Sequence, residues 1–206
     1  MLIGIMGYAR SGKNTFATLL SKIVGEGRTV AELSFAGKLK TELCTMLRAV
    51  GVDTSDIFLS KKELWRPMMV AWGKQRRAIY PNYWVDPVIK HYKRIMSMPT
   101  KGAEPICIIT DVRYLNEAEA IKESGGLLVH IVNTKSEGEK PANEEEFLSM
   151  FRITKSDLYD DVIKIENDGE SIQKLHNEAV KLAYGEMGLT MPAYYDTINE
   201  PEDSRT

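Results

Sequence analysis

The first residues whose types and spacing could do chemistry stand at the amino end of the chain. A short apolar run, Leu2–Met6, ends at Gly7, and Gly12-Lys13 follows five residues later at the start of a helical pattern. A strand, a glycine-rich loop and a helix in this order are typical of a phosphate-binding loop. Glycine lets phosphate oxygens approach backbone N–H groups, and the positive end of the helix dipole points at the same anion. The stretch therefore predicts a phosphate site.

Lys13 and the residues after it could supply the charges that such a site needs. A lysine at this position can reach the outer phosphates, and a following hydroxyl helps to hold Mg²⁺. The hydroxyl usually comes directly after the lysine, but here that position is Asn14, and Thr15 stands one place later. The alternative interpretation is a glycine-rich turn that only connects a strand to a helix.

A second candidate is Asp111, which directly follows the apolar stretch Ile106–Thr110. In a protein with a phosphate-binding loop, an acidic residue at the end of a buried strand is the usual partner of Mg²⁺, directly or through water. The alternative is that Asp111 caps the helix that we expect to begin near Tyr114.

Arg113 lies two residues beyond Asp111. A phosphoryl group carries negative charge on its oxygens, and the planar guanidinium fork suits it. The spacing is equally compatible with an ion pair between Arg113 and Glu117 or Glu119.

A third group of candidates mixes cations with aromatic rings between the second and third predicted strands. A nucleotide base needs a flat apolar wall, and a phosphate needs fixed cations, so such an insertion could bind a second nucleotide. The alternative is that the tryptophans belong to the core and the charges lie on solvated helix faces. Neighbouring arginines cannot both face one site, so we expect at most one of Arg76 and Arg77 to matter. The candidates are Lys38, Lys40, Arg66, Lys74, Arg76 and Arg77, with Trp65, Trp72, Tyr80, Tyr83 and Trp84.

Alternating strand-like and helix-like segments must position these residues. After the first loop, helical patterns are expected at 13–20, 38–50, 60–80, 82–98, 116–124 and 171–184. Ser60 could cap the third of these, with Glu63 at the capping-box position. The polar segment 133–146 and the tail 190–206 show no regular pattern. Apolar runs predict strands at 2–6, 29–35, 106–110, 127–132 and 161–165.

Strands that alternate with crossover helices form a parallel sheet with helices on both faces, which is an α/β fold. Ligands of such folds gather at the carboxyl ends of the strands. Residues 7–15, 34–40 and 111–113 all follow predicted strands. We therefore expect these three motifs to share one site.

Composition sets wider limits. A chain of 206 residues, of which 43% are hydrophobic and 27% charged, is expected to form one soluble domain or one domain with an inserted lid. The net charge of −2 gives no basic field that would favour binding to nucleic acid or membrane. Cys44 and Cys107 lie in apolar patterns and are expected to be reduced core residues of a cytosolic protein. The three histidines, His91, His130 and His176, show no metal-binding spacing.

Taken together, the motifs resemble those of bacteriophage deoxynucleoside monophosphate kinases, in the adenylate-kinase-like branch of the P-loop kinases. Gly12-Lys13-Asn14-Thr15 is similar to that family's Gly-Lys-Asp-Thr, which accounts for the shifted hydroxyl. Asp111–Ala118 is close to its Asp-Val-Arg-Phe-x-Asn-Glu-Ala. Weaker similarities cover Ser34–Lys40, Arg66 with Trp72-Gly73, Tyr83-Trp84-Val85 and Asn167-Asp168-Gly169, so the resemblance extends over residues 1–183.

This resemblance implies a three-layer P-loop kinase fold with a five-stranded parallel sheet. It implies transfer of the ATP γ-phosphoryl group to a (deoxy)nucleoside 5′-monophosphate, with ATP and Mg²⁺ as cofactors. The expected organisation is a single kinase domain over 1–189, with an acceptor-binding helical insertion at about 36–100, a lid at about 133–160 and an irregular tail at 190–206. The expected partners are small-molecule nucleotides in the (host) cytoplasm, with no nucleic acid and no membrane; a homodimer is left open.

The resemblance also assigns residues to roles. Lys13, Asp111 and Arg113 would be catalytic, and Thr15 and Asp111 would hold the metal ion. Arg152 is a candidate for the catalytic arginine of the lid. The ATP-binding residues would be Gly7, Arg10, Ser11, Gly12, Lys13, Asn14, Thr15 and Arg152, and the acceptor-binding residues would be Lys38, Lys40, Arg66, Trp72, Arg76, Trp84 and Arg113.

Three departures from the family pattern leave the base preference and the catalytic arginine of the lid open. Val70 stands where the family often has a base-reading glutamine, Lys74 where it often has threonine, and Thr154 near a usual lid histidine. Two alternatives therefore remain: a P-loop kinase of another small phosphate acceptor, such as dephospho-coenzyme A or phosphomevalonate, and a nucleotide-binding protein that makes no product.

Overall fold

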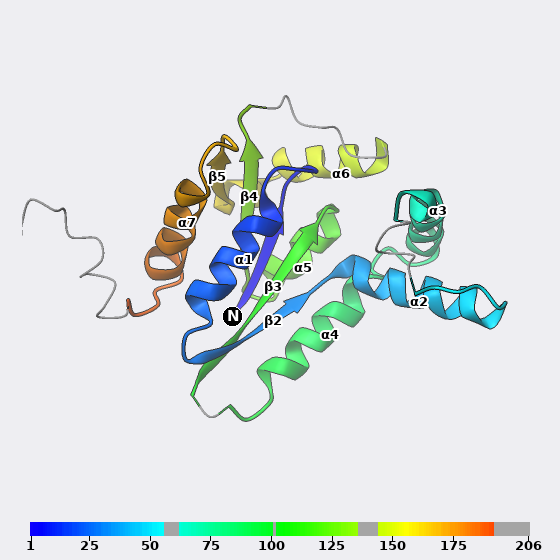
Figure 1. The fold of residues 1–206 in the computed structure, drawn as a ribbon, viewed down its shortest axis with the longest axis horizontal. Helices are drawn as coiled ribbons and strands as arrows, with labels where there is room; N and C mark the ends of the chain where they lie inside the picture. Colours follow the sequence, from blue (N-terminus) through cyan, green and yellow to red (C-terminus); the bar gives the residue numbers. More distant parts are fainter. Residues whose placement is uncertain (56–61, 101, 136–143, 192–206) are drawn as a thin grey trace, which may run out of the picture.

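A five-stranded parallel sheet forms the centre of the protein, in the strand order β2-β3-β1-β4-β5 (Figure 1). The computed structural model describes residues 1–55, 62–100, 102–135 and 144–191. All five predicted strands are confirmed, with shifts of a few residues at their ends. Their bounds are β1 Leu2–Met6, β2 Arg28–Leu33, β3 Ala103–Val112, β4 Leu127–Asn133 and β5 Ile163–Asn167.

Helices cover both faces of this sheet, which confirms the predicted α/β fold. One face carries α1, α7 and the π-helical turn η2, and the other carries α4, α5 and α6. In Figure 1, α2 and α3 project from the β2 edge of the sheet, away from α7. The bounds are α1 Lys13–Val24, α2 Phe35–Ala49, α3 Lys62–Ile79, α4 Val85–Met96, α5 Leu115–Glu123, α6 Glu144–Thr154, the 3₁₀ turn η1 Asp157–Asp161, α7 Ile172–Lys181 and η2 Leu182–Glu186.

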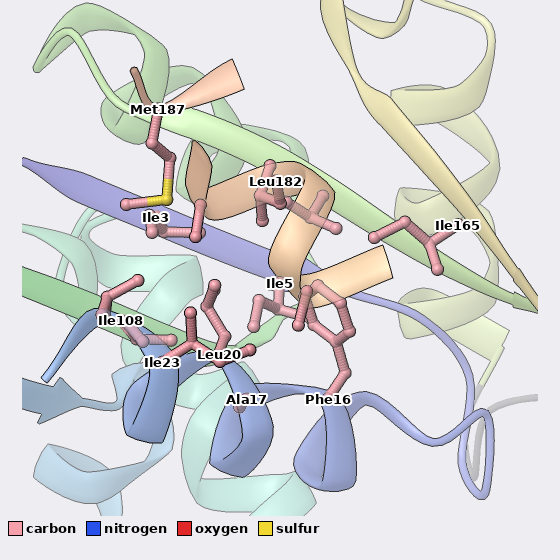
Figure 2. Close-up of a cluster of buried hydrophobic side chains, with 14 of the residues drawn as sticks. Ile3, Ile5, Phe16, Ala17, Leu20, Ile23, Ile108, Ile165, Leu182 and Met187 are labelled. Carbon is pink, nitrogen blue, oxygen red and sulfur yellow. The ribbon is translucent and has the colours of Figure 1, made fainter. Parts of the chain in front are cut away.

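The alternation of side chains along β1 divides the core into two halves. Ile3 and Ile5 point to the α1 face, whereas Leu2 and Met6 point to the other, and all four are fully buried. Figure 2 shows the first half, in which side chains of α1 meet those of the strands and of η2. Because β1 is packed on both faces, the loop that follows it starts from a rigid element.

Two helices differ from the prediction. The helix expected from residue 38 begins at Phe35, because the Ser34 hydroxyl accepts the backbone N–H of Gly37 at 3.0 Å and caps it. The helix α6 lies partly in the segment expected to be irregular, and its residues Met150 and Ile153 are buried in the core. Ser60 and the tail beyond residue 191 lie outside the described residues.

Three further expectations can be compared with the described part of the chain. The region between β2 and β3 is helical, as predicted. Cys44 and Cys107 are buried and not disulfide-bonded. Over the described residues, no helix is both long enough and apolar enough to span a membrane.

Candidate active site

The loop between β1 and α1 adopts a backbone conformation that favours glycine at two positions. Gly7 has φ 151° and Gly12 has φ 93°, and Arg10 between them also has a positive φ, of 58°. The backbone N–H of Ser11 donates to the Tyr8 carbonyl at 3.2 Å, which closes the loop on itself. A side chain at Gly7 would bring its Cβ to 2.6 Å from the Ser11 hydroxyl, so the sequence of the loop is matched to its shape.

Asn167, at the end of β5, fixes the far side of this loop. Its Nδ2 donates to the Ser11 carbonyl at 2.9 Å, and its Oδ1 accepts the backbone N–H of Gly169 at 3.1 Å. A Cβ on Gly12 would lie only 2.4 Å from the same Nδ2. The sequence indicated Asn167 only as part of a family motif, and its contact with the loop depends on β5 lying beside β4.

Several donors in the loop are suited to an anion. Within the described residues, no side chain caps the N-terminus of α1, and the Ser11 hydroxyl is buried without a hydrogen-bond partner. The Lys13 ammonium group folds back over the loop and donates to the Tyr8 carbonyl at 3.0 Å. The side chains of Asn14 and Thr15 are exposed at the start of α1. An orphan hydroxyl, an uncapped helix and a lysine in one place fit a bound phosphate chain.

Asp111 is the second-to-last residue of β3, and its side chain holds the N-terminus of α2. One carboxylate oxygen accepts the backbone N–H of Phe35 at 3.1 Å. The other accepts the Ser34 hydroxyl at 2.7 Å and the backbone N–H of Ala36 at 2.8 Å. Asp111 is therefore a helix cap, as the alternative interpretation held, but of α2 rather than of the helix near Tyr114.

The turn after Asp111 is organised by Glu117. One oxygen of its buried carboxylate accepts the backbone N–H of Arg113 at 2.7 Å and that of Tyr114 at 3.0 Å. Burial, and secondarily repulsion from Asp111, raises the pKa of Glu117 to about 8. Glu117 thus contacts the backbone of Arg113 and fixes the start of α5.

The predicted acceptor region contains a compact cluster of Glu42, Trp72, Arg76 and Tyr83. The Arg76 guanidinium lies 4.3 Å from the centroid of the Trp72 ring and 5.3 Å from that of Tyr83. Its Nε donates to Glu42 Oε1 at 3.0 Å, and the Tyr83 hydroxyl donates to Glu42 Oε2 at 2.9 Å. The cluster joins α2, α3 and the N-terminal side of α4.

Arg77 points elsewhere, as the prediction about neighbouring arginines required. Its guanidinium lies 3.9 Å from the centroid of the Tyr114 ring and donates to the Tyr114 hydroxyl at 2.7 Å. Tyr114 directly follows Arg113, so Arg77 belongs with the turn after β3. The sequence predicted that at most one arginine of the pair would matter at a single site. It did not indicate which one meets this turn, because that depends on how α3 packs on its neighbours.

The remaining predicted acceptor residues have separate surroundings. Trp84 is only 3% exposed, and its indole N–H donates to the Gly73 carbonyl at 3.2 Å. It therefore packs α4 against α3, and a direct contact between Trp84 and a ligand would require movement of these helices. Arg66 forms an ion pair with Glu63 at 2.6 Å, and Lys38 is exposed. Lys40 is half-buried on α2.

The predicted lid contributes one contact to the same turn. Arg152 is exposed on α6. Ser149, also on α6, is buried, and its hydroxyl accepts the backbone N–H of Leu115 at 2.9 Å. Lys140, another cation of the segment expected to form the lid, lies outside the described residues. Thr15 and Asp111 stay predictions as metal-binding residues. The described residues include no group of three or more His, Cys, Asp or Glu side chains that could hold a metal ion.

A strand, a glycine loop and a lysine-headed helix on a parallel sheet of this order define the protein as a P-loop kinase. Residues 5–126 match the family model for phosphomevalonate kinase. Because this match covers more than half of the 206 residues, the chain belongs to the phosphomevalonate kinase family.

Solved structures of small-molecule kinases are similar to the chain at low sequence identity. Shikimate kinase from Aquifex aeolicus is 16% identical with a TM-score of 0.47, over 92% of this chain and 100% of that one. Shikimate kinase from Acinetobacter baumannii, in complex with shikimate, is 13% identical with a TM-score of 0.42, over 90% and 93%. APS kinase from Mycobacterium tuberculosis is 14% identical with a TM-score of 0.40, over 89% and 96%.

Proposed function

We propose that the protein transfers the γ-phosphoryl group of ATP to the phosphate of a (deoxy)nucleoside 5′-monophosphate. The observation that carries this choice of acceptor is the cluster of Trp72, Arg76 and Tyr83 beside α2. Flat rings suit a planar base, and an aliphatic acceptor has no ring to stack on them, whereas a fixed guanidinium can bind polar groups of either acceptor. Membership of a family of kinases that act on a phosphate group supports phosphoryl transfer to such a group.

The donor half of the site is the loop from Gly7 to Thr15. The N-terminus of α1 and the Ser11 hydroxyl would bind phosphate oxygens of ATP. Lys13 would leave the Tyr8 carbonyl and bind the outer phosphates, since a phosphate is a stronger partner for an ammonium group than a neutral carbonyl is.

Thr15 and Asp111 would hold Mg²⁺, which would neutralise charge on the β- and γ-phosphates when bound. The donor set fits this ion only in part. The Thr15 side chain is exposed and accessible, but Asp111 already accepts three hydrogen bonds from α2. The oxygen that accepts only the Phe35 N–H keeps one lone-pair direction, so contact through a metal-bound water suits Asp111 better than direct ligation.

The reaction itself needs no acid or base. The bond between the γ-phosphorus and the β,γ-bridging oxygen breaks, and a bond forms between the γ-phosphorus and an oxygen of the acceptor phosphate. The products are ADP and a nucleoside diphosphate. Transfer of this kind depends on positioning and on neutralisation of charge. Arg113, which precedes Tyr114 in the chain, and Arg77, held by the Tyr114 ring, would neutralise the acceptor phosphate.

Water must be excluded from such a site, because otherwise ATP is hydrolysed. We assign this role to the 133–160 segment, in keeping with the sequence-based expectation. Its second half is anchored by Met150 and Ile153 in the core and by the bond from Leu115 to Ser149. Arg152, which is exposed on α6 in this segment, would supply positive charge to the closed site.

A second candidate acceptor is phosphomevalonate, which the family match favours. It carries the same phosphate group but no ring. The two candidates therefore share the donor half and the turn after β3, and differ at the Trp72–Arg76–Tyr83 cluster.

The experiment is an acceptor panel. The purified protein is mixed with ATP and Mg²⁺ and with each (deoxy)nucleoside monophosphate, phosphomevalonate or dephospho-coenzyme A. ADP is followed with a coupled assay, and the product is identified by ³¹P NMR. We expect acceptor-dependent ADP together with a nucleoside diphosphate. Turnover of phosphomevalonate alone would replace the first candidate with the second, and no acceptor-dependent ADP with any compound would refute both.

A further inference from the structure

Residues 113–116, in the turn after β3, contact three other parts of the chain. Tyr114 binds α3 and Leu115 binds α6, as described above. The third contact comes from Asn116, whose side chain reaches the loop between α3 and α4. The turn that carries Arg113 is thus tied to this loop as well.

Asn116 holds the loop through its amide nitrogen. Nδ2 donates to the Pro81 carbonyl at 3.0 Å and to Asn82 Oδ1 at 2.9 Å. A carbonyl oxygen can only accept hydrogen bonds, so two such oxygens that face one side chain need a group with two N–H donors. The amide nitrogen of asparagine carries two hydrogens, one for each oxygen. A side chain of the same size without these donors could not replace Asn116 here.

The loop held in this way, residues 80–84, supports the acceptor cluster. Tyr83 belongs to the loop, and its hydroxyl binds Glu42 of the cluster. The Asn82 carbonyl accepts the backbone N–H of Val85 at 2.9 Å, where α4 begins. A shift of Asn82 would therefore displace both Tyr83 and the start of α4.

Arg113 and Asn116 belong to one rigid unit. The buried Glu117 carboxylate accepts the backbone N–H of Arg113 and ties it to the first turn of α5, where Asn116 lies. Arg113 would bind the acceptor phosphate, and the cluster around Arg76 would bind the rest of the acceptor. The two hydrogen bonds of Asn116 thus set the separation between these two groups.

We infer that Asn116 is a positioning residue: its amide fixes the loop 80–84, and with it the acceptor cluster, relative to Arg113. This inference rests on the proposed function. Phosphoryl transfer depends on placing the acceptor oxygen in line with the bond that breaks, so a displaced cluster would weaken productive binding of the acceptor. ATP would bind at the loop after β1, which the two hydrogen bonds of Asn116 do not involve. Loss of the amide should therefore affect the acceptor and not ATP.

The test is to measure kcat and KM of Asn116→Ala and Asn116→Asp, for ATP and for the acceptor that the panel identifies. Asn116→Ala loses two hydrogen bonds, so the KM for the acceptor should rise about tenfold while the KM for ATP stays unchanged. Asn116→Asp keeps the size but turns a charged oxygen toward two other oxygens, so its effect should be larger. A purely structural role gives the opposite order, because a negative charge in the first turn of α5 suits the helix dipole.

Asn177→Ala is the matched control. Asn177 is exposed on α7, where its side chain accepts the amide of Gln173 at 3.0 Å, so this variant should leave both KM values unchanged. Loss of folded protein would lower kcat without changing either KM, and thermal unfolding measures that loss directly.

Four results would overturn the inference and leave the kinase in place. They are an unchanged KM for the acceptor, a KM for ATP that rises equally, a smaller effect of Asn116→Asp than of Asn116→Ala, and failure of both variants to fold. If only one variant folds, its two KM values decide. Absence of turnover with every acceptor of the panel would instead refute the proposed function, and the inference with it.

Discussion

Substitution of Gly12 by alanine tests whether Asn167 holds the phosphate-binding loop in shape. The new Cβ would lie 2.4 Å from Asn167 Nδ2, and Gly12 has φ 93°. A left-handed conformation costs a residue with a Cβ about 1–2 kcal/mol. Asn167 is 7% exposed and bonded to Ser11 and to Gly169, so it can move only if those bonds break.

The overlap should therefore add about 1–3 kcal/mol to the backbone cost, giving a total loss of about 3 kcal/mol in the free energy of unfolding. Gly27→Ala is the matched control, because Gly27 also has a positive φ, of 75°, but a Cβ there would meet nothing within 4 Å. Its cost should stay near 1 kcal/mol, since fewer unfolded conformations offset part of the strain.

Urea unfolding followed by circular dichroism, without ligands, measures both values. The double variant Gly12→Ala/Asn167→Ala should lose less stability than the sum of its two parts, because removal of the amide relieves the overlap. The reasoning is refuted if Gly12→Ala and Gly27→Ala agree within about 0.5 kcal/mol, or if the double variant is additive.

Three further predictions concern single side chains. Lys13→Ala should lower kcat at least about a hundredfold with unchanged thermal stability. Lys22→Ala, on the exposed last turn of α1, should leave kcat unchanged. Retained turnover by Lys13→Ala would exclude a role for Lys13 in phosphoryl transfer. Burial raises the pKa of Glu117 to about 8 in the folded protein, so the carboxyl group ionises at lower pH in the unfolded chain. Tm should therefore fall as pH rises from about 5 to 8, and Glu117→Gln should flatten this fall. Equal slopes for the two proteins would contradict the burial argument. Burial, with a smaller effect of Lys164, lowers the pKa of His130 to about 4, so Tm should fall as pH drops from about 6.5 to 4. His130→Phe should remove that part of the fall. An unchanged dependence of Tm on pH in this range would contradict the argument.

Much of the sheet follows from local pattern alone. Ile106–Ile109 is apolar throughout, and such a run in a chain of alternating elements has few alternatives to a buried central strand. The loop after β1 could also be predicted from the sequence, because Gly7 and Gly12 have positive φ angles that favour glycine.

The helix α6 was missed although the sequence contains a signal for it. Met150 and Ile153 are three residues apart and both buried, and this spacing is typical of one helix face. The three acidic residues at 144–146 instead led to the prediction of an irregular polar segment. By contrast, no local signal distinguishes Arg77 from Arg76, since only the packing of α3 decides which of them meets Tyr114.

Asp111 shows why partners are harder to predict than positions. Its place at the end of a strand was clear from sequence, but its hydrogen-bond donors come from residues 34–36, and they reach it only because β2 lies beside β3 in the sheet. This arrangement gives one carboxylate two duties in the proposed reaction. It fixes the helix that begins the acceptor insertion, and it faces the edge of the sheet where the donor phosphates would bind. An acceptor that shifts α2 would therefore also shift a carboxylate that would help to hold Mg²⁺, so the two halves of the site would be coupled through Asp111.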